Sequence, residues 1–288
     1  MRLSRREAAI TLALAALPCA GCAAAQKFGP GPAAGSSNAA ASGGASASSE
    51  AASPSITSSA SPRSVALPLA GSVVGIDPGH NGGNFTDPGF INQLIWNGRE
   101  QETCDTAGTE TAGGYTEALF NFHVASHLRD DLVAAGATVV MTRKTNNGVG
   151  PCVNHRAEII NAAHADVAID IHADGGPTWG RGFTVLEPVA DGPNDKVIRD
   201  SIGFGRTVRS ALLKYTRMPQ SDYYGHNGVV FRNDLAGLNL TTVPKVLIEC
   251  GNMPNLTDAA LLASPSFQRE IAGAFTTAII SYLTGSQA

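Results

Sequence analysis

Apolar residues recur along this chain with two different spacings, which together predict alternating strands and helices from residue 72 onward. Short runs rich in Val and Ile predict strands at 72–77, 138–141, 167–171, 183–186, 229–231 and 246–248. Apolar positions three or four residues apart predict helices at 115–135, 153–163, 195–215, 256–263 and 266–283. Strands that alternate with helices of this length are typical of an α/β domain with a largely parallel sheet.

Two stretches show neither spacing. Residues 79–114 are polar and rich in Gly, Asn and Thr, and a loop of that length inside a compact domain is usually functional. Residues 23–66 consist mainly of Ala, Ser, Gly and Pro, and only Lys27, Glu50 and Arg63 carry charge. Such a composition cannot bury enough apolar surface to offset the entropy lost on ordering. We therefore expect 23–66 to be a disordered tether and 67–288 to form one domain.

The first 22 residues have the features of an export signal. Arg2, Arg5 and Arg6 precede an apolar stretch at 8–17, and the start also resembles a twin-arginine signal. The sequence predicts an exported protein of the periplasm, the cell wall or the medium. The run ending at Cys22 resembles a lipobox, which would attach a lipid to that cysteine and tether the chain to the membrane. Ordinary cleavage near residues 23–25 is the alternative.

The net charge of the chain limits which kinds of molecule it can bind. The whole chain has a formal net charge of −4, whereas residues 67–288 carry 15 Lys and Arg against 22 Asp and Glu, a net of −7. Binding to nucleic acid requires a basic surface for phosphate contacts, so a domain this acidic excludes that function. No later segment reaches the roughly 18 apolar residues that a membrane span needs. We expect a monomer that does not cross the membrane repeatedly.

Three cysteines remain after the signal. Cys104 and Cys152 lie in polar, Gly-rich sequence, whereas Cys250 follows an apolar strand. Because an exported protein can form disulfides, we expect Cys104 to pair with Cys152 and Cys250 to be a buried free thiol.

Candidate metal ligands follow three of the predicted strands. His80 comes after the first strand, His172 after the middle strand, and Glu249 after the last, while Glu117 begins a helix. The carboxyl ends of strands are where the chemistry of α/β sheets collects. Two imidazoles and one carboxylate suit a catalytic zinc ion, and a second carboxylate can then transfer protons.

The residues around these candidates resemble the zinc-dependent N-acetylmuramoyl-L-alanine amidases, most closely the small mycobacterial-type members without a wall-binding domain. Four motifs carry the resemblance, in the order of the family. They are Ile76-Asp77-Pro78-Gly79-His80-Asn81-Gly82-Gly83, Tyr115-Thr116-Glu117-Ala118-Leu119-Phe120-Asn121, Asp170-Ile171-His172-Ala173-Asp174 and Val246-Leu247-Ile248-Glu249-Cys250-Gly251-Asn252-Met253-Pro254-Asn255. The segment 90–112 resembles an insertion relative to compact members of the family.

The resemblance implies a site and a substrate. His80, Glu117 and His172 match the zinc ligands, Glu249 matches the catalytic glutamate, and Arg156 matches an arginine on the helix before the middle strand. The family has a twisted six-stranded sheet flanked by helices. It cuts the amide between the lactyl group of N-acetylmuramic acid and the L-alanine of the peptidoglycan stem peptide, in wall remodelling or cell separation.

Further residues are candidates for positions around this set. Asp170 lies two residues before His172 on the same strand face, so we expect it to contact a ligand imidazole. Asn252 and His226 are candidates for contacts around the substrate. Glu249 has the alternative of a buried acid paired with Arg156. Trp96 and Trp179 suit either sugar stacking or local packing.

Two functional alternatives stay open beside the amidase. One is a zinc carboxypeptidase or endopeptidase that acts within the stem peptide. The other is an exported zinc-binding or wall-binding module without catalysis.

Overall fold

The computed structural model describes residues 67–286, and the predicted signal, tether and Cys22 therefore lie outside the described residues. A six-stranded sheet forms the centre, with the strand order β4-β1-β5-β8-β6-β7. Its strands are β1 (Val73–Pro78), β4 (Thr138–Met141), β5 (Val167–Asp174), β6 (Thr184–Pro188), β7 (Val229–Arg232) and β8 (Lys245–Asn252). The strands β4, β1, β5 and β8 run parallel, while β6 pairs antiparallel with β8 and parallel with β7. The predicted α/β sheet is confirmed.

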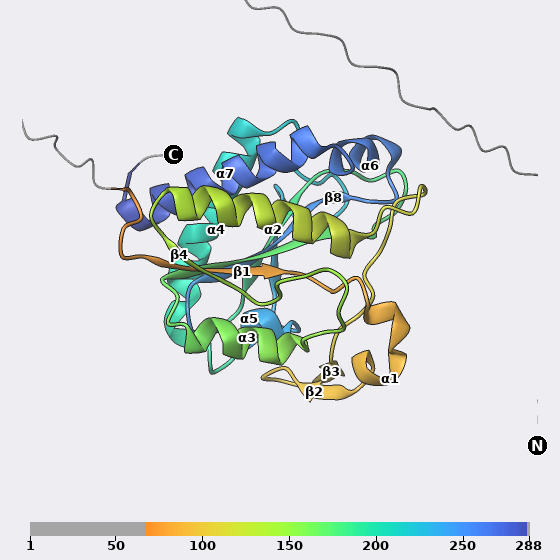
Figure 1. Cartoon of the computed structure of the whole chain (residues 1–288), viewed down its shortest axis with the longest axis horizontal. Helices are drawn as coiled ribbons and strands as arrows, with labels where there is room; N and C mark the ends of the chain where they lie inside the picture. Colours follow the sequence, from red (N-terminus) through yellow and green to blue (C-terminus); the bar gives the residue numbers. More distant parts are fainter. Residues whose placement is uncertain (1–66, 287–288) are drawn as a thin grey trace, which may run out of the picture. The chain divides into compact units, whose positions relative to one another are not determined.

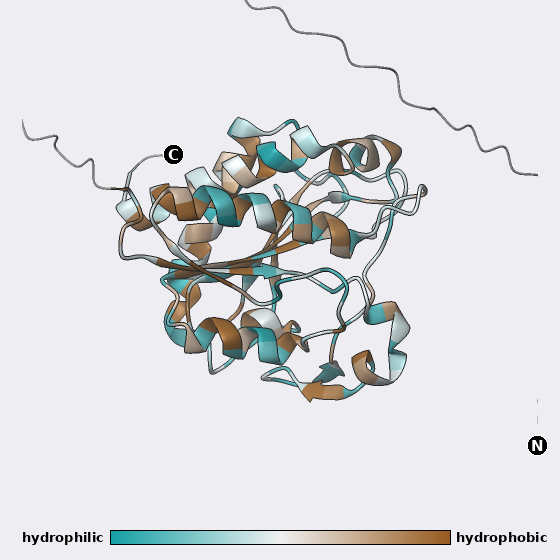
Figure 2. Cartoon of the chain, viewed as in Figure 1, coloured by the Kyte–Doolittle hydropathy of each residue, from teal (hydrophilic) through white to brown (hydrophobic). Residues whose placement is uncertain are grey.

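Helices cover both faces of this sheet (Figure 1). One face packs against α2 (Glu117–Ala134), α4 (Ile198–Tyr215) and α7 (Pro265–Thr284), with α6 (Leu256–Leu262) beside the end of β8. The other face packs against α3 (Val153–Ala162) and the short α5 (Ala236–Asn239). Brown, apolar residues dominate the strands of the sheet, whereas the helices around it carry both brown and teal, polar residues (Figure 2). None of the helices in this part of the chain has the length and apolar character needed to cross a membrane.

Apolar and polar side chains alternate along most of β5, so the apolar ones lie on one face of the sheet and the polar ones on the other. On β5, Val167, Ile169 and Ile171 join the large core with α2, α4 and α7. The intervening residues Asp170 and His172 therefore point toward the face of α3 and α5, because side chains alternate across a sheet. The polar side chains of the site thus leave the sheet on the side away from the large core.

The strands that lead to the site are longer than predicted. β5 continues to Asp174 and β8 runs from Lys245 to Asn252, whereas the sequence predicted only their apolar centres. Polar residues at these ends pair in register, His172 beside Glu249 across β5 and β8. These side chains face the site rather than solvent, so hydropathy alone ends the strands too early.

The segment 79–114 contains more structure than a loop. It forms a 3₁₀ turn (Asn84–Thr86), the short α1 (Pro88–Ile91), and an antiparallel pair of β2 (Leu94–Trp96) and β3 (Gln101–Thr103). Asn97 donates to the carbonyl of Asp234, and Glu102 accepts from the amide of Ala236, so the pair is attached to the α5 region. Elements of three or four residues are too short for periodicity to reveal.

A buried ion cluster lies beneath the carboxyl end of β1. Asp77 and Asp170 are register neighbours on β1 and β5, and both are buried. Lys245 of β8, only 1% exposed, places its Nζ 2.8 Å from Asp77 Oδ2 and 3.2 Å from Asp170 Oδ2. This cation therefore bridges two adjacent carboxylates in a place that water does not reach.

We predict that Lys245→Met destabilises the domain by about 3 to 5 kcal/mol, because it leaves two buried carboxylates without their shared cation. Urea unfolding monitored by circular dichroism measures the change. Lys196→Met is the matched control, since Lys196 is exposed and its replacement should stay within about 0.5 kcal/mol. Equal unfolding free energies for the two variants would contradict this account of the cluster.

Candidate metal centre

Three side chains meet in the structure as a group that could hold a metal ion. His80, Glu117 and His172 place their ligand atoms within 4.8 Å of one another. His80 Nε2 lies 3.2 Å from Glu117 Oε1, and His172 Nδ1 lies 2.9 Å from the same oxygen. Two imidazole nitrogens and a carboxylate oxygen are a donor set that zinc prefers.

The local backbone explains how the three residues meet. His80 follows β1 with a φ of 56°, a left-handed conformation that non-glycine residues rarely adopt. At Gly79, an added Cβ would lie 2.1 Å from the ring of His172, so only glycine lets the two elements approach. Glu117 is the first residue of α2, where the helix dipole favours a negative charge. It also accepts hydrogen bonds from the amides of Thr109 and Ala173.

The outward nitrogen of each imidazole faces another carboxylate. His80 Nδ1 lies 3.1 Å from Asp105 Oδ1, and His172 Nε2 lies 3.3 Å from Asp170 Oδ1. Each ring therefore has one nitrogen directed at Glu117 and the other at an aspartate. The expected contact of Asp170 with a ligand imidazole is present in this geometry.

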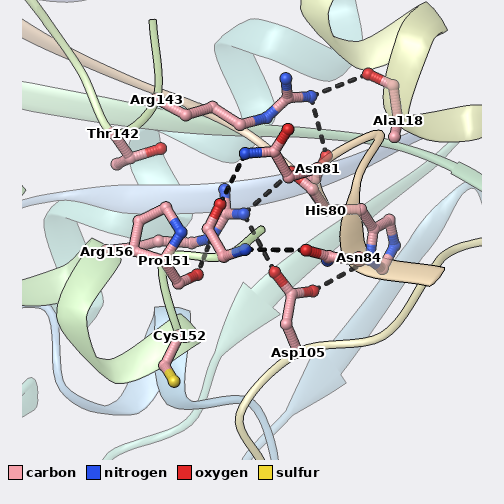
Figure 3. A network of polar contacts seen from close by, with 12 residues as sticks. His80, Asn81, Asn84, Asp105, Ala118, Thr142, Arg143, Pro151, Cys152 and Arg156 are labelled. Atoms are coloured by element: carbon pink, nitrogen blue, oxygen red, sulfur yellow. Dashed lines mark hydrogen bonds and ion pairs between the residues drawn. The ribbon is translucent and has the colours of Figure 1, made fainter. Parts of the chain in front are cut away.

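Buried cations hold the two aspartates in turn. Arg156, 2% exposed, donates to Asp105 Oδ2 at 3.0 Å (Figure 3). It also donates to Asp77 Oδ1 at 3.1 Å. Lys245 performs the same task between Asp77 and Asp170. The alternative in which Arg156 pairs with Glu249 is wrong, because the ion pairs of Arg156 are with Asp77 and Asp105.

Charges within this group shift its protonation in the protein without metal. Burial lowers the pKa of His80, but the charge of Glu117 and hydrogen bonds to Asp105 and Glu117 outweigh it and raise the pKa to about 9. Burial also opposes the charged form of His172, yet Asp170 and Glu117 raise its pKa well above the usual value. The two imidazoles hold the pKa of Glu117 well below its usual value against the effect of burial.

Glu249 lies beside this group without belonging to it. It lines the same cavity of about 320 Å³ as His80, Glu117 and His172. Its Oε2 is buried and has no hydrogen-bond partner within residues 67–286. Burial, reinforced by the charges of Glu117 and Asp174, raises the pKa of Glu249 to about 8 despite the opposing imidazoles. An acid of this kind can take up and release a proton near neutral pH.

Two of the expected peripheral residues lie elsewhere. His226 is exposed in a turn and hydrogen-bonds with Asn227, outside the residues that line the cavities around the histidines. Asn252 is buried and donates to the carbonyls of Pro177 and Gly180, so it holds the loop after β5 rather than contacting the cavity. The structure does not bring either residue to His80, Glu117 and His172.

The structure also shows where the two tryptophans and the three cysteines of the sequence predictions lie. Trp96 is 53% exposed on β2 and Trp179 is 71% exposed on the loop after β5, so neither is buried by local packing. Cys104 and Cys152 are joined in the structure, and Cys250 is a buried free thiol.

Sequence reasoning missed two residues of the site. Asp105 lies in the segment without periodicity. Lys245 lies at the start of an apolar strand, where a lysine is expected to be exposed to solvent. One signal was available for Asp105, because it follows Cys104, and the partner Cys152 precedes Arg156 by four residues. A disulfide between those cysteines brings Asp105 and Arg156 together.

We predict that the metal-free protein loses stability as the pH rises from about 6.5 to about 9. His80 and Glu249 both have folded pKa values above their unfolded values, so the folded state binds their protons more tightly. The contribution of Glu249 is lost between about pH 4.5 and 8 and that of His80 between about pH 6.5 and 9, so both decline within this interval. Urea titrations of chelator-treated protein should show a loss of up to about 5 kcal/mol.

His80→Asn should flatten this dependence, whereas the exposed His155→Gln should preserve it. An unfolding free energy that stays constant or rises across the interval would contradict the assignment.

Comparisons with known proteins identify the family of this chain. The family model described as N-acetylmuramoyl-L-alanine amidase matches residues 74–281. An N-acetylmuramoyl-L-alanine amidase of Mycobacterium tuberculosis is 38% identical over 222 residues, which cover 75% of this chain and 88% of the relative. The amidase Ami1 of Mycobacterium abscessus has a TM-score of 0.70 and 40% identity, covering 75% of this chain and 100% of that chain. Ami1 of Mycobacterium smegmatis has a TM-score of 0.71 and 38% identity, covering 76% and 99%. The chain belongs to the N-acetylmuramoyl-L-alanine amidase family.

Proposed function

We propose that this chain is a zinc-dependent amidase that separates the lactyl group of N-acetylmuramic acid from the L-alanine of the stem peptide. The observation that carries the proposal is the convergence of His80, Glu117 and His172 beside an unpartnered Glu249. The membership of the chain in the amidase family supports the choice of substrate. We expect one zinc ion per chain.

The donor set fits zinc and predicts which atoms hold it. His80 Nε2 and His172 Nδ1 both face Glu117 Oε1, so these three atoms are the proposed ligands. Asp105 lies 3.1 Å from the other ring nitrogen of His80 and Asp170 lies 3.3 Å from that of His172, so the inward nitrogens are the ones proposed to bind a metal. When bound, zinc polarises a carbonyl group and lowers the pKa of a water molecule.

Glu249 is the proposed acid and base. Its carboxylate accepts a proton from the attacking water, and its carboxyl group then donates that proton to the departing L-alanine nitrogen. A raised pKa suits both halves of this cycle, because the group must be ionised first and protonated later. Its unpartnered Oε2 has no competing hydrogen bond from the described residues to hold it away from the substrate.

The remaining walls of the cavity suggest how the substrate is held. Leu186, Leu235 and Leu247 supply an apolar side, and Arg232 supplies a cation. Arg232 also donates to Asp234 through two nitrogens and to the hydroxyl of Tyr224, so its position is fixed. We assign to these residues the binding of the substrate around the scissile amide. Residues 67–288 carry a net charge of −7, so overall charge cannot attract an anionic cell wall and the cavity must provide the binding.

We also propose that the chain is exported and acts as a monomer in wall remodelling or cell separation. The basic and apolar start of the sequence supports export.

Lipid attachment at Cys22 is the finer hypothesis, and membrane fractionation of the wild type and Cys22→Ser tests it. Release of both forms into the soluble fraction would argue for ordinary cleavage.

We predict that Glu249→Gln binds zinc as the wild type does but hydrolyses muropeptides about 100- to 10,000-fold more slowly. The amide keeps the size of the side chain and removes the proton acceptor. Mass spectrometry of digested peptidoglycan measures the loss, and Glu270→Gln on the surface is the matched control.

The masses also separate the proposed activity from its rivals. An amidase releases intact stem peptides with a free L-alanine amino terminus, whereas a carboxypeptidase or endopeptidase shortens the stem. Unchanged turnover in Glu249→Gln would overturn the role of Glu249. Bound zinc without any product from the wild type would support a non-catalytic module.

A further inference from the structure

The segment 90–112 supplies the surroundings of one metal ligand. Nδ1 of His80 lies 3.1 Å from Asp105 Oδ1, 3.1 Å from the carbonyl oxygen of Thr106 and 3.2 Å from Thr106 Oγ1. All three acceptors come from two successive residues. His172 differs, because its aspartate partner Asp170 lies two residues earlier on the same strand, so the strand itself keeps the two residues near each other.

Asp105 is fixed through both of its carboxylate oxygens. Oδ1 faces His80 and also accepts from the amide of Thr106 at 2.7 Å. Oδ2 accepts from Arg156, which donates as well to the carbonyl oxygens of His80 and Pro78. Arg156 therefore holds the backbone of His80 and the carboxylate that faces its ring in one arrangement (Figure 3).

The disulfide joins the two chain segments that carry these groups. Cys104 directly precedes Asp105, and Cys152 is the residue before α3, which carries Arg156 in its first turn. Backbone hydrogen bonds strengthen the junction, since the amide of Val153 donates to Cys104 and the amide of Asp105 donates to Ile91. Asp105 lies 25 residues after His80, so a loose segment would not hold it at this distance.

We propose that Asp105 is a positioning residue that orients His80 for metal binding, and that the Cys104–Cys152 disulfide holds Asp105 in that place. The carboxylate fixes the ring so that Nδ1 carries the proton and Nε2 is directed at Glu117. The inserted segment thus serves the metal centre itself. This inference rests on the proposed zinc site.

Asp105→Asn tests the first half of the inference. His80 and Arg156 approach different oxygens of Asp105, and in an asparagine one of these positions becomes an NH2 group that cannot accept from its neighbour. Zinc affinity, measured by competition with a chromogenic chelator, should fall about 10- to 100-fold. Glu100→Gln removes one negative charge from an exposed site in the same segment and should leave the affinity unchanged.

The double variant Cys104→Ser/Cys152→Ser tests the second half and should also weaken zinc binding, by a smaller factor than Asp105→Asn. The visible spectrum of the cobalt-loaded protein adds a readout that general destabilisation does not move. Its ligand-field bands should shift in Asp105→Asn and stay unchanged in Glu100→Gln.

The outcomes are distinguishable. Folded variants with wild-type zinc affinity and an unchanged cobalt spectrum would overturn the inference while leaving the amidase proposal intact. A wild-type protein that binds no zinc would instead overturn the proposed metal centre. Reaction of Cys104 and Cys152 with a thiol reagent in the native wild type, located by peptide mapping, would overturn the role of the disulfide.

Discussion

The rest of the site depends on the ion pairs that the buried carboxylate of Asp77 makes with Lys245 and Arg156. This carboxylate is buried at the end of β1 and receives Lys245 on one oxygen, and Arg156 and the hydroxyl of Thr142 on the other. These partners hold the pKa of Asp77 well below its usual value even though burial opposes the charge. Each cation then binds a second carboxylate, Lys245 that of Asp170 and Arg156 that of Asp105. Charge therefore alternates outward from Asp77 until it reaches the two histidines.

Such a network is expensive to bury, and a comparable apolar cluster would stabilise the domain as well or better. What the network contributes is the orientation of the two imidazole rings. Each imidazole meets a carboxylate on its outer nitrogen, so the inner nitrogens of His80 and His172 are set toward Glu117 before any metal binds. Glu249 on the adjacent strand stays outside the network, and its Oε2 has no hydrogen-bond partner among the described residues. In the proposed function, the same set of charges prepares the metal site and leaves Glu249 free for proton transfer.

The sequence predicted this site only where chemistry and periodicity coincide. The Val- and Ile-rich strands, the amphipathic helices and the motifs around His80, Glu117, His172 and Glu249 all stand out in the linear pattern. Lys245 does not, because a lysine at the start of a strand reads as solvent-exposed until the neighbouring strands bring Asp77 and Asp170 beside it. Asp105 escapes for a related reason, since its partners His80 and Arg156 are distant in sequence and meet only through the fold.

The central claim is that the Asp77 network presents His80 Nε2, His172 Nδ1 and Glu117 to one metal ion. Diffraction from zinc-loaded crystals at the zinc absorption edge tests it most directly. The account predicts one anomalous peak, bonded to those two nitrogens and to a Glu117 oxygen, with Asp105 and Asp170 still on the outer nitrogens. Zinc bonded through His80 Nδ1 or His172 Nε2, or a peak away from these residues, would contradict it.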